Sequence, residues 1–137
     1  KAEYGVQIFW EAQLIARSLI KTSPEISQLD EEIKSQSRGV AYLYRQKLEK
    51  ALKIELETKA DQCFKDFYGC IRRHVDSIVI EKTKPGNKNT QMIMNLSCLL
   101  PSNKSAELGE ELERINRTDG FSVRFTGPWP PYSFVGT

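Results

Sequence analysis

Residues 77–100 read SIVIEKTKPGNKNTQMIMNLSCLL, and this stretch decides the fold. Every second residue of its second half is apolar, and this set comprises Met92, Met94, Leu96, Cys98 and Leu100. A period of two is typical of a strand with one buried face. Residues 77–83 also favour a strand, and the polar residues 84–89, with a proline and a glycine, favour a turn. We therefore predict a β-hairpin formed by strands 77–83 and 92–100.

Two further strands flank this hairpin in the sequence. Residues 4–10 carry large apolar side chains at period two, at Tyr4, Val6, Ile8 and Trp10. Residues 121–126 follow an Asp-Gly turn and repeat the pattern with Phe121, Val123 and Phe125. Between the hairpin and this last strand, we expect Asn103 to cap a helix. The buried stripe of that helix is predicted to be Leu108, Leu112 and Ile115.

The long connection between the first two strands, residues 11–76, is predicted to be helical. Ser23 precedes a proline and a glutamate, which is a favourable helix start, and this helix should run to about Ser35. We expect Gly39 to break the chain before a helix of about 35 residues, roughly 50 Å long, that ends near Val75. Gly69 is its weak point, because glycine in a helix interior costs about 1 kcal/mol.

The order strand, helices, strand, strand, helix, strand predicts an α+β fold. It matches the ferredoxin-like βαββαβ arrangement, an antiparallel sheet with the helices mainly on one face. We expect the strand order 4-1-3-2. The first crossover is much longer than one helix requires, so residues 11–76 are interpreted as an elongated helical insertion or subdomain within a domain of residues 1–137. The chain starts with Lys rather than Met, and we expect a separate N-terminal domain to precede it.

Composition and charge exclude several classes of function. The net charge is +2, with 39% hydrophobic and 28% charged residues, so no bulk electrostatic attraction to nucleic acid or to an anionic membrane is expected. Residues 92–100 lack the aromatic side chains with which an RNA-recognition motif stacks bases. No apolar run approaches the roughly 18 residues of a membrane-spanning helix. The three cysteines show no disulfide or zinc spacing and suggest a reducing compartment.

Candidate catalytic residues are scarce. His74 is the one histidine, and it follows two arginines near a predicted helix end, where a cationic side chain suits the helix dipole. The carboxylates at Glu110, Glu111 and Glu113 are typical of a solvated helix face. No nucleotide-binding, metalloprotease or hydrolase motif is present. We therefore expect no catalytic residue, no cofactor and no metal site. The alternative is a small-molecule enzyme on a ferredoxin-like scaffold, with a site brought together only by folding.

The end of the chain is its most distinctive segment, with three prolines and three aromatic residues. Proline fixes its own φ and restricts the residue before it, so the segment should be extended and stiff. The aromatic side chains can either fold back and close one end of the core or form an exposed anchor for a partner. We expect the first role. The candidate structural or partner-binding residues are Gly127, Pro128, Trp129, Pro130, Pro131, Tyr132 and Phe134.

Mixed charges along the long predicted helix, from Arg45 to Asp61, also allow two interpretations. They can form a solvated face with neighbouring opposite charges, such as Glu49 and Lys53. They can also belong to a projecting arm of coiled-coil type that other proteins bind.

The string 127–135, after the strand 121–126, closely resembles the ending of the gas vesicle protein F/L family. Residues 3–8 of the first strand and residues 38–43 at the start of the long helix are also similar to that family. The C-terminal string is highly specific and the other two segments are moderately so. The chain therefore resembles the C-terminal domain of this family, and its residues do not separate F from L.

This resemblance implies an accessory protein of gas vesicles that is required for their assembly. Its implied partners are the gas vesicle shell protein and other gas vesicle accessory proteins. The implied location is the gas vesicle within the cytoplasm, on the inner, gas-facing side of the shell. No enzymatic activity, cofactor or metal is implied. The resemblance leaves open whether the protein releases shell subunits as an assembly chaperone or remains as a minor structural component.

The predicted insertion generates a test in solution. If the helical insertion extends beyond the sheet, small-angle X-ray scattering of residues 1–137 should give a radius of gyration above the roughly 14 Å of a compact chain of this length. A value at or below that figure would instead mean that the long helix is folded back or broken near Gly69.

Overall fold

The computed structural model describes residues 1–135 of the chain. These residues form two compact units, one made of residues 1–11 with the residues from 63 onward, and the other of residues 12–62. The chain contains four strands, four α-helices and two short 3-10 helices in these described residues. Helix α3, Arg38–Arg72, contributes residues to both units.

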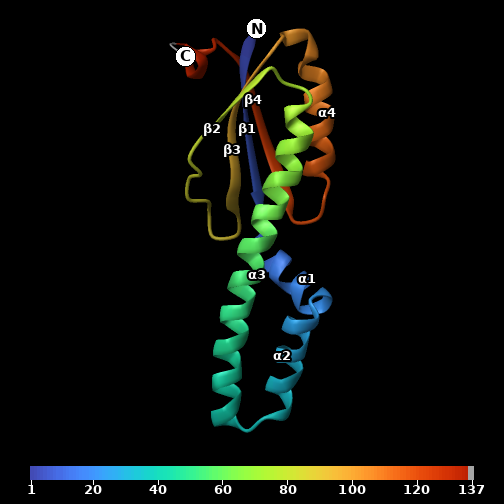
Figure 1. The fold of residues 1–137 in the computed structure, drawn as a ribbon, viewed down its shortest axis with the longest axis vertical. Helices are drawn as coiled ribbons and strands as arrows, with labels where there is room; N and C mark the ends of the chain where they lie inside the picture. Colours follow the sequence, from blue (N-terminus) through green and yellow to red (C-terminus); the bar gives the residue numbers. More distant parts are fainter. Residues whose placement is uncertain (136–137) are drawn as a thin grey trace. The chain divides into compact units, whose positions relative to one another are not determined.

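The first unit is built on a four-stranded antiparallel sheet (Figure 1). Its strands are β1 (Ala2–Trp10), β2 (Ser77–Ile80), β3 (Gln91–Leu100) and β4 (Phe121–Trp129). Their spatial order is β2-β3-β1-β4, so the predicted order 4-1-3-2 is confirmed. Helices α1, α2 and α3 all lie in the sequence between β1 and β2. The predicted ferredoxin-like α+β fold with a long helical first crossover is therefore confirmed.

The period-two residues of the two central strands form the core. Val6 pairs with Leu96 and Ile8 with Met94, and all four side chains are at most 1% exposed. Helix α4, Ser105–Asn116, covers this face of the sheet with its predicted stripe of Leu108, Leu112 and Ile115 (Figure 1). The C-terminal turns of α3 lie on the same face, as Figure 1 also shows.

Aromatic rings connect these turns of α3 to the sheet. Phe67 meets Phe121 edge to face with ring centroids 5.4 Å apart, and Trp10 lies 6.3 Å from the same Phe121 ring. Such pairs add about 0.5–1.5 kcal/mol each to the stabilisation from buried area. The indole N–H of Trp10 also donates a hydrogen bond to Gln91, so its polar atom is satisfied.

The second unit consists of α1 (Ala12–Thr22), α2 (Pro24–Ser35) and the first part of α3. Ser23 caps α2, because its hydroxyl accepts a hydrogen bond from the Ile26 N–H at 3.4 Å. The predicted helix from Pro24 to Ser35 is thus confirmed. Ile26 is fully buried, and α2 lies beside the first half of α3 (Figure 1).

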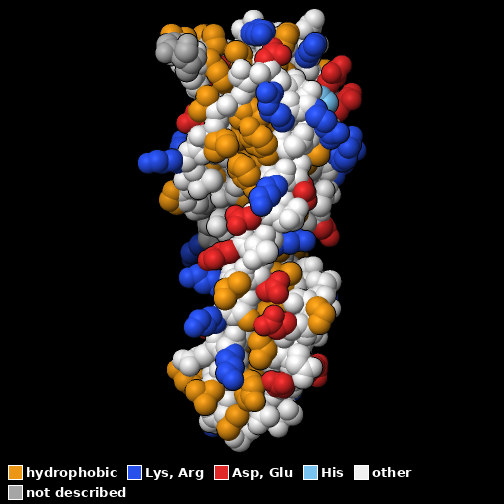
Figure 2. Space-filling view, in the orientation of Figure 1, with side chains coloured by type: hydrophobic (Ala, Val, Ile, Leu, Met, Phe, Trp, Pro, Cys, Tyr) orange, Lys and Arg blue, Asp and Glu red, His pale blue; other side chains and the backbone are white. Residues whose placement is uncertain are grey.

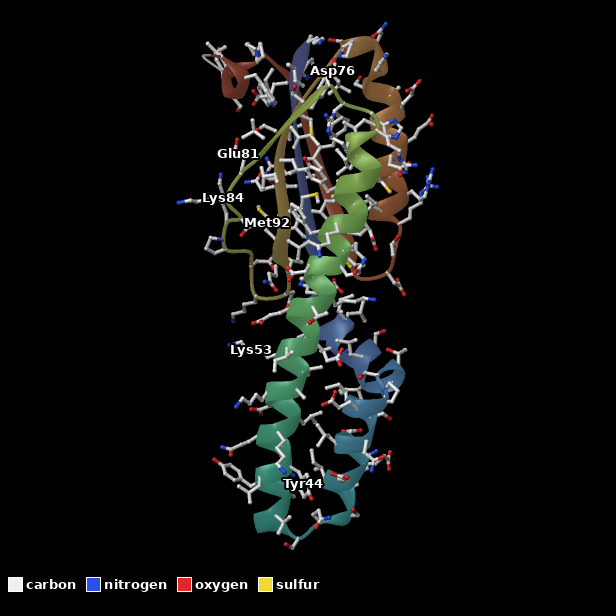
Figure 3. All side chains as sticks on the ribbon, in the orientation of Figure 1. Tyr44, Lys53, Asp76, Glu81, Lys84 and Met92 are labelled. Carbon is white, nitrogen blue, oxygen red and sulfur yellow. The ribbon has the colours of Figure 1, made fainter. Side chains whose placement is uncertain are left out.

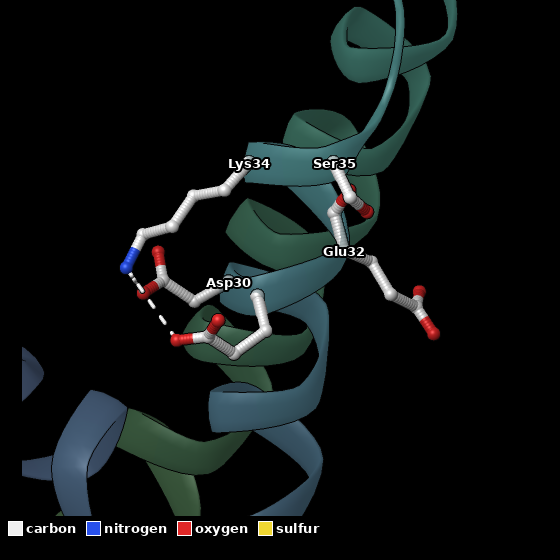
Figure 4. A network of polar contacts seen from close by, with 5 residues as sticks. Asp30, Glu32, Lys34 and Ser35 are labelled. Atoms are coloured by element: carbon white, nitrogen blue, oxygen red, sulfur yellow. Dashed lines mark hydrogen bonds and ion pairs between the residues drawn. The ribbon is translucent and has the colours of Figure 1, made fainter.

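The end of α2 is a network of exposed polar contacts (Figure 4). Lys34 lies 3.8 Å from Asp30 and 3.5 Å from Glu31, and the Ser35 hydroxyl donates to the Glu32 carbonyl. Exposed pairs of this kind contribute little to stability. These side chains form a polar, water-exposed surface of α2.

The prediction that Gly39 breaks the chain is wrong. Gly39 lies in the first turn of α3, and the Ala41 N–H already donates to the Ser37 carbonyl. Glycine is tolerated there because the first helical N–H groups lack intrahelical partners in any case, so a glycine costs less there than in the interior. The helix ends at Arg72 rather than near Val75.

Two other predicted boundaries are also wrong. Strand β2 ends at Ile80 instead of Thr83, because the chain then lies against Asn95, whose side chain donates to the Lys82 carbonyl. Asn103 does not cap α4. It lies within a 3-10 helix, Ser102–Lys104, and the Ser105 hydroxyl donates to the Ser102 carbonyl at the start of α4.

The glycine inside the long helix generates a stability prediction. Gly69→Ala should raise the free energy of unfolding by about 0.5–1 kcal/mol, because alanine favours a helix interior. The added Cβ has open space around it. Urea denaturation followed by circular dichroism measures the change.

Gly5→Ala is the matched control. Its Cβ would lie 2.5 Å from the Thr126 hydroxyl oxygen, so this variant should lose stability. A loss of stability in Gly69→Ala would show that this part of α3 is packed differently.

Candidate functional site

The candidate site is the segment of residues 127–134, called the aromatic ending below, and its first residues lie within the sheet. Strand β4 continues past the predicted Thr126 to Trp129, and Trp129 pairs with Glu3 of β1. The pairing register shifts between Glu3 and Gly5, opposite the Gly-Pro step of β4. The last strand therefore carries the first part of the aromatic ending on its own backbone.

Gly127 is required by its conformation and by its neighbours. Its φ is +119°, in the region that side chains other than glycine rarely adopt. A Cβ at this position would lie 2.8 Å from the Glu3 carbonyl oxygen and 2.9 Å from the Tyr4 ring. The peptide bond that follows, Gly127–Pro128, is cis.

A carboxylate fastens the segment after Trp129 to the sheet. Tyr132–Phe134 form a 3-10 helix, and the N–H of Ser133 donates to Glu3 Oε1 at 2.8 Å. The Ser133 hydroxyl donates to Glu3 Oε2 at 3.0 Å. Both oxygens of Glu3 thus accept hydrogen bonds from one residue, and bonds to a charged acceptor are the stronger kind.

Further hydrogen bonds connect Ser133 to polar side chains of the neighbouring strand and of the segment after β2. The Ser133 hydroxyl lies 3.4 Å from that of Ser97 on β3, and the Ser97 hydroxyl donates to Glu81 at 3.2 Å. Ser97 alternates along β3 with Leu96 and Cys98, which are buried beneath the helices, so these polar side chains lie on the opposite face. Glu81 belongs to the segment that follows β2, shown with Lys84 in Figure 3.

Two of the three aromatic side chains of the ending are largely exposed to solvent. Trp129 is 52% exposed and Tyr132 is 75% exposed, while Phe134 is half-buried. Pro128 and Pro130 are exposed and Pro131 is half-buried. The expectation that these aromatics close the core is therefore wrong for Trp129 and Tyr132.

That end of the core is closed by other residues. Tyr4 is 4% exposed and stacks on Phe125 with centroids 5.4 Å apart. Glu3, Ser97 and Ser133, which hold the ending in place, did not stand out in the sequence, although Glu3 and Ser133 both lie in the segments that resemble a known family.

His74 and Glu111 form an ion-pair cluster with two arginines, so the expected solvated helix face is wrong for Glu111. His74 Nε2 lies 4.0 Å from Glu111, whose carboxylate also lies 3.4 Å from Arg114 and 3.8 Å from Arg73. Glu111 is largely buried, so the two arginines beside it suit its charge. Within residues 1–135 no group of three or more His, Cys, Asp or Glu side chains is placed to hold a metal ion.

Cys98 is an unreactive thiol. Burial beneath the helices, and to a lesser extent the Glu3 carboxylate, raise its pKa to about 12. Since the thiolate is the nucleophilic form, this side chain stays protonated and acts as a small hydrophobic residue.

No helix in the described part of the chain is both long enough and apolar enough to cross a membrane.

Comparisons with known proteins give a consistent result. The family model described as gas vesicle synthesis protein GvpL/GvpF matches residues 1–136. The chain is 24% identical to gas vesicle protein L of Haloferax mediterranei and 23% identical to gas vesicle protein L2 of Halobacterium salinarum, in each case over 97% of its own length. The matched regions are 43% and 50% of those two proteins.

Solved structures show the same fold. Gas vesicle protein GvpF from Anabaena sp. superposes with a TM-score of 0.76 at 15% identity, covering 99% of this chain and 54% of that one. GvpF from Microcystis aeruginosa superposes with a TM-score of 0.55 at 19% identity, covering 97% and 53%. The chain thus spans about half the length of the relatives that it matches.

Two tyrosines, one buried and one exposed, test the geometry of the ending. Tyr132→Ala should change the free energy of unfolding by no more than about 0.5 kcal/mol, because the side chain is mostly in solvent. Tyr4→Ala should cost about 3–5 kcal/mol, because it removes a buried aromatic side chain. Chemical denaturation of both variants measures the difference. An equally large loss in Tyr132→Ala would restore the core-closing interpretation.

Proposed function

This chain belongs to the gas vesicle synthesis protein GvpL/GvpF family, and on that premise we propose that it binds the gas vesicle shell protein and assists assembly of the shell. The role is non-catalytic. We place the protein at the gas vesicle within the cytoplasm, with other gas vesicle accessory proteins as further partners. A position on the gas-facing side of the shell is part of the same proposal.

The observation that carries the proposal is an exposed aromatic pair on a fixed backbone. Trp129 and Tyr132 present apolar surface to solvent, while Glu3 holds the backbone next to Tyr132 through Ser133. Aromatic anchors dominate the energy of many interfaces. Because the backbone is already ordered, little conformational entropy is lost when a partner binds.

The chemistry of a gas-filled shell explains why its subunit needs such a partner. A wall that keeps liquid water out of a gas space must present apolar surface, and a free subunit exposes that surface before assembly. Exposed apolar surface drives aggregation. An accessory protein that covers part of it keeps the subunit available for assembly. Release of the subunit would make the protein a chaperone, and retention would make it a minor component.

The edge of the sheet offers a mode of binding that includes the aromatic pair. Strand β4 lies at one edge, and edge strands can pair with an extended segment of another protein. The Asn116 side chain accepts the Val123 N–H, so the start of this edge is already occupied. A client strand is therefore expected beside the later part of β4, where it would also meet Trp129.

The ion-pair cluster supports a non-catalytic role. His74 lies beside one carboxylate that is neutralised by arginines, an arrangement that stabilises charge rather than transfers protons. The interaction surfaces, not a reactive group, are therefore the features to test.

A pull-down with purified shell protein tests the proposal. The double variant Trp129→Ala/Tyr132→Ala should weaken binding by about tenfold or more, because each aromatic anchor contributes on the order of 1–2 kcal/mol. Tyr42→Ala, which removes an aromatic residue that is 60% exposed in the other unit, is the matched control and should bind normally. Circular dichroism confirms that each variant is folded.

Two results would contradict the proposal. The first is an absence of binding both by this chain and by the full-length protein that contains it. The second is full binding by the double variant, which would remove the aromatic ending from the site.

A further inference from the structure

We propose that the first half of α3 carries a second docking surface, which accepts an amphipathic helix whose apolar stripe is flanked by acidic residues. The surface lies within residues 12–62, apart from the aromatic ending, and does not depend on the function proposed above. Its central row is Val40, Leu43, Lys47, Lys50 and Ile54.

The spacing of this row places it on one side of the helix. Successive members are separated by three, four, three and four residues, which is the repeat of a helix that packs against another helix. Fourteen residues separate Val40 from Ile54, which corresponds to about 21 Å of helix. A partner helix of four to five turns matches this length.

The apolar members of the row are in solvent, unlike those of the inward stripe of α3. Val40, Leu43 and Ile54 are 40%, 57% and 58% exposed, whereas Ala41 is 5% exposed. Leu48, Leu52 and Leu56 are half-buried. Helix α3 therefore has one apolar side that is at least partly buried and a second set of apolar residues that is exposed. Exposed apolar side chains at helix-packing spacing, interrupted here by two lysines, are typical of an interaction surface.

Two adjoining hollows follow the row. The first, about 410 Å³, is lined by Val40, Leu43, Tyr44, Gln46, Lys47 and Lys50. The second, about 260 Å³, shares both lysines and extends past Ala51 to Ile54. Figure 2 shows hydrophobic side chains over this part of α3, near the turn from α2, with basic side chains beside them.

The charges around the hollows select an acidic partner. The first hollow is lined by two lysines and by no carboxylate. Within residues 1–135 neither lysine lies within 4 Å of a carboxylate oxygen, and Lys47 instead lies 5.1 Å from the centre of the Tyr44 ring. Glu25 and Glu55 line the second hollow. The acidic residues of the partner should therefore lie over the first hollow.

A second copy of this chain fits less well than a different helix. Its α2 is acidic, but Ile26 is fully buried and Leu29 and Ile33 are half-buried, so α2 lacks a free apolar stripe to fill the hollows. Its carboxylates at Asp30 and Glu31 are also partly neutralised by Lys34. The surface thus favours a helix from another protein.

A pair of synthetic peptides tests this surface. Each has about 18 residues, the length of five helical turns, with leucines at three- and four-residue spacing. One carries glutamates and the other lysines beside the leucines. Fluorescence anisotropy with residues 1–137 should show about tenfold or tighter binding of the acidic peptide, weakening as salt is added.

Charge reversal provides the specific variant. Lys47→Glu/Lys50→Glu should reverse the preference, so that the lysine peptide binds more tightly. Lys53→Glu/Lys59→Glu makes the same change of charge on the same helix outside the hollows, and should keep the preference for the acidic peptide. Lys53 projects from the side of α3 away from α2 (Figure 3). Leu43→Asp should abolish binding of both peptides.

Three outcomes would overturn the inference: equal binding of the two peptides, no binding of either, or an unchanged preference after the reversal at Lys47 and Lys50. Light scattering that shows a dimer dispersed by Leu43→Asp would assign the surface to a second copy instead. Trp129→Ala/Tyr132→Ala should leave peptide binding unchanged, so failure here and failure of shell-protein binding are separate results.

Discussion

Pairing of β1 with two neighbours is the constraint on which the first unit depends. β1 lies between β3 and β4, and through β3 it is joined to β2. The strands on its two sides come from distant parts of the sequence, so β1 connects them through its backbone hydrogen bonds. Its alternation then serves two purposes. Val6 and Ile8 face the helices and form the core, whereas Glu3 holds the aromatic ending.

This arrangement couples order at the ending to order in the core. Displacement of β1 would separate Glu3 from Ser133 and would also remove the partner of β4 near Trp129. The exposed aromatic pair therefore rests on a central strand of the sheet. Interaction sites on rigid elements hold their geometry better than sites on loops.

Much of the first unit was predictable because its signals are periodic and local. The alternation from Met92 to Leu100 and the stripe at Leu108, Leu112 and Ile115 each predict a buried face, and the structure buries both sets of residues. The other face of β3 was expected in solvent, but Ile93 and Asn95 on that face are also buried. In the second unit, the serine cap at Ser23 is a local signal of the same kind. Boundaries failed where another contact decided them. Asn95 ends β2 early through a side-chain bond, and the 3-10 turn displaces Asn103 from a capping position.

The sequence identified which residues form the candidate site, but not that Trp129 and Tyr132 are exposed. The prolines and the glycine of the ending predict a stiff, sharply turned backbone. Gly127 has a positive φ, which explains why glycine occupies this position. The bond from Ser133 to Glu3 joins residues 130 positions apart, and no periodicity relates them. Without it, the aromatic side chains are naturally expected to fold onto the core, which Tyr4 and Phe125 already close.

The contrast between the two tryptophans has a spectroscopic consequence. Trp10 is 2% exposed and its indole is hydrogen-bonded to Gln91, whereas Trp129 is 52% exposed beside the ending. A water-soluble quencher such as acrylamide or iodide reaches the second ring far more readily than the first. Since these are the chain's two tryptophans, its intrinsic fluorescence separates into an internal standard and a surface reporter. The protein thus carries a label at its candidate site without any chemical modification.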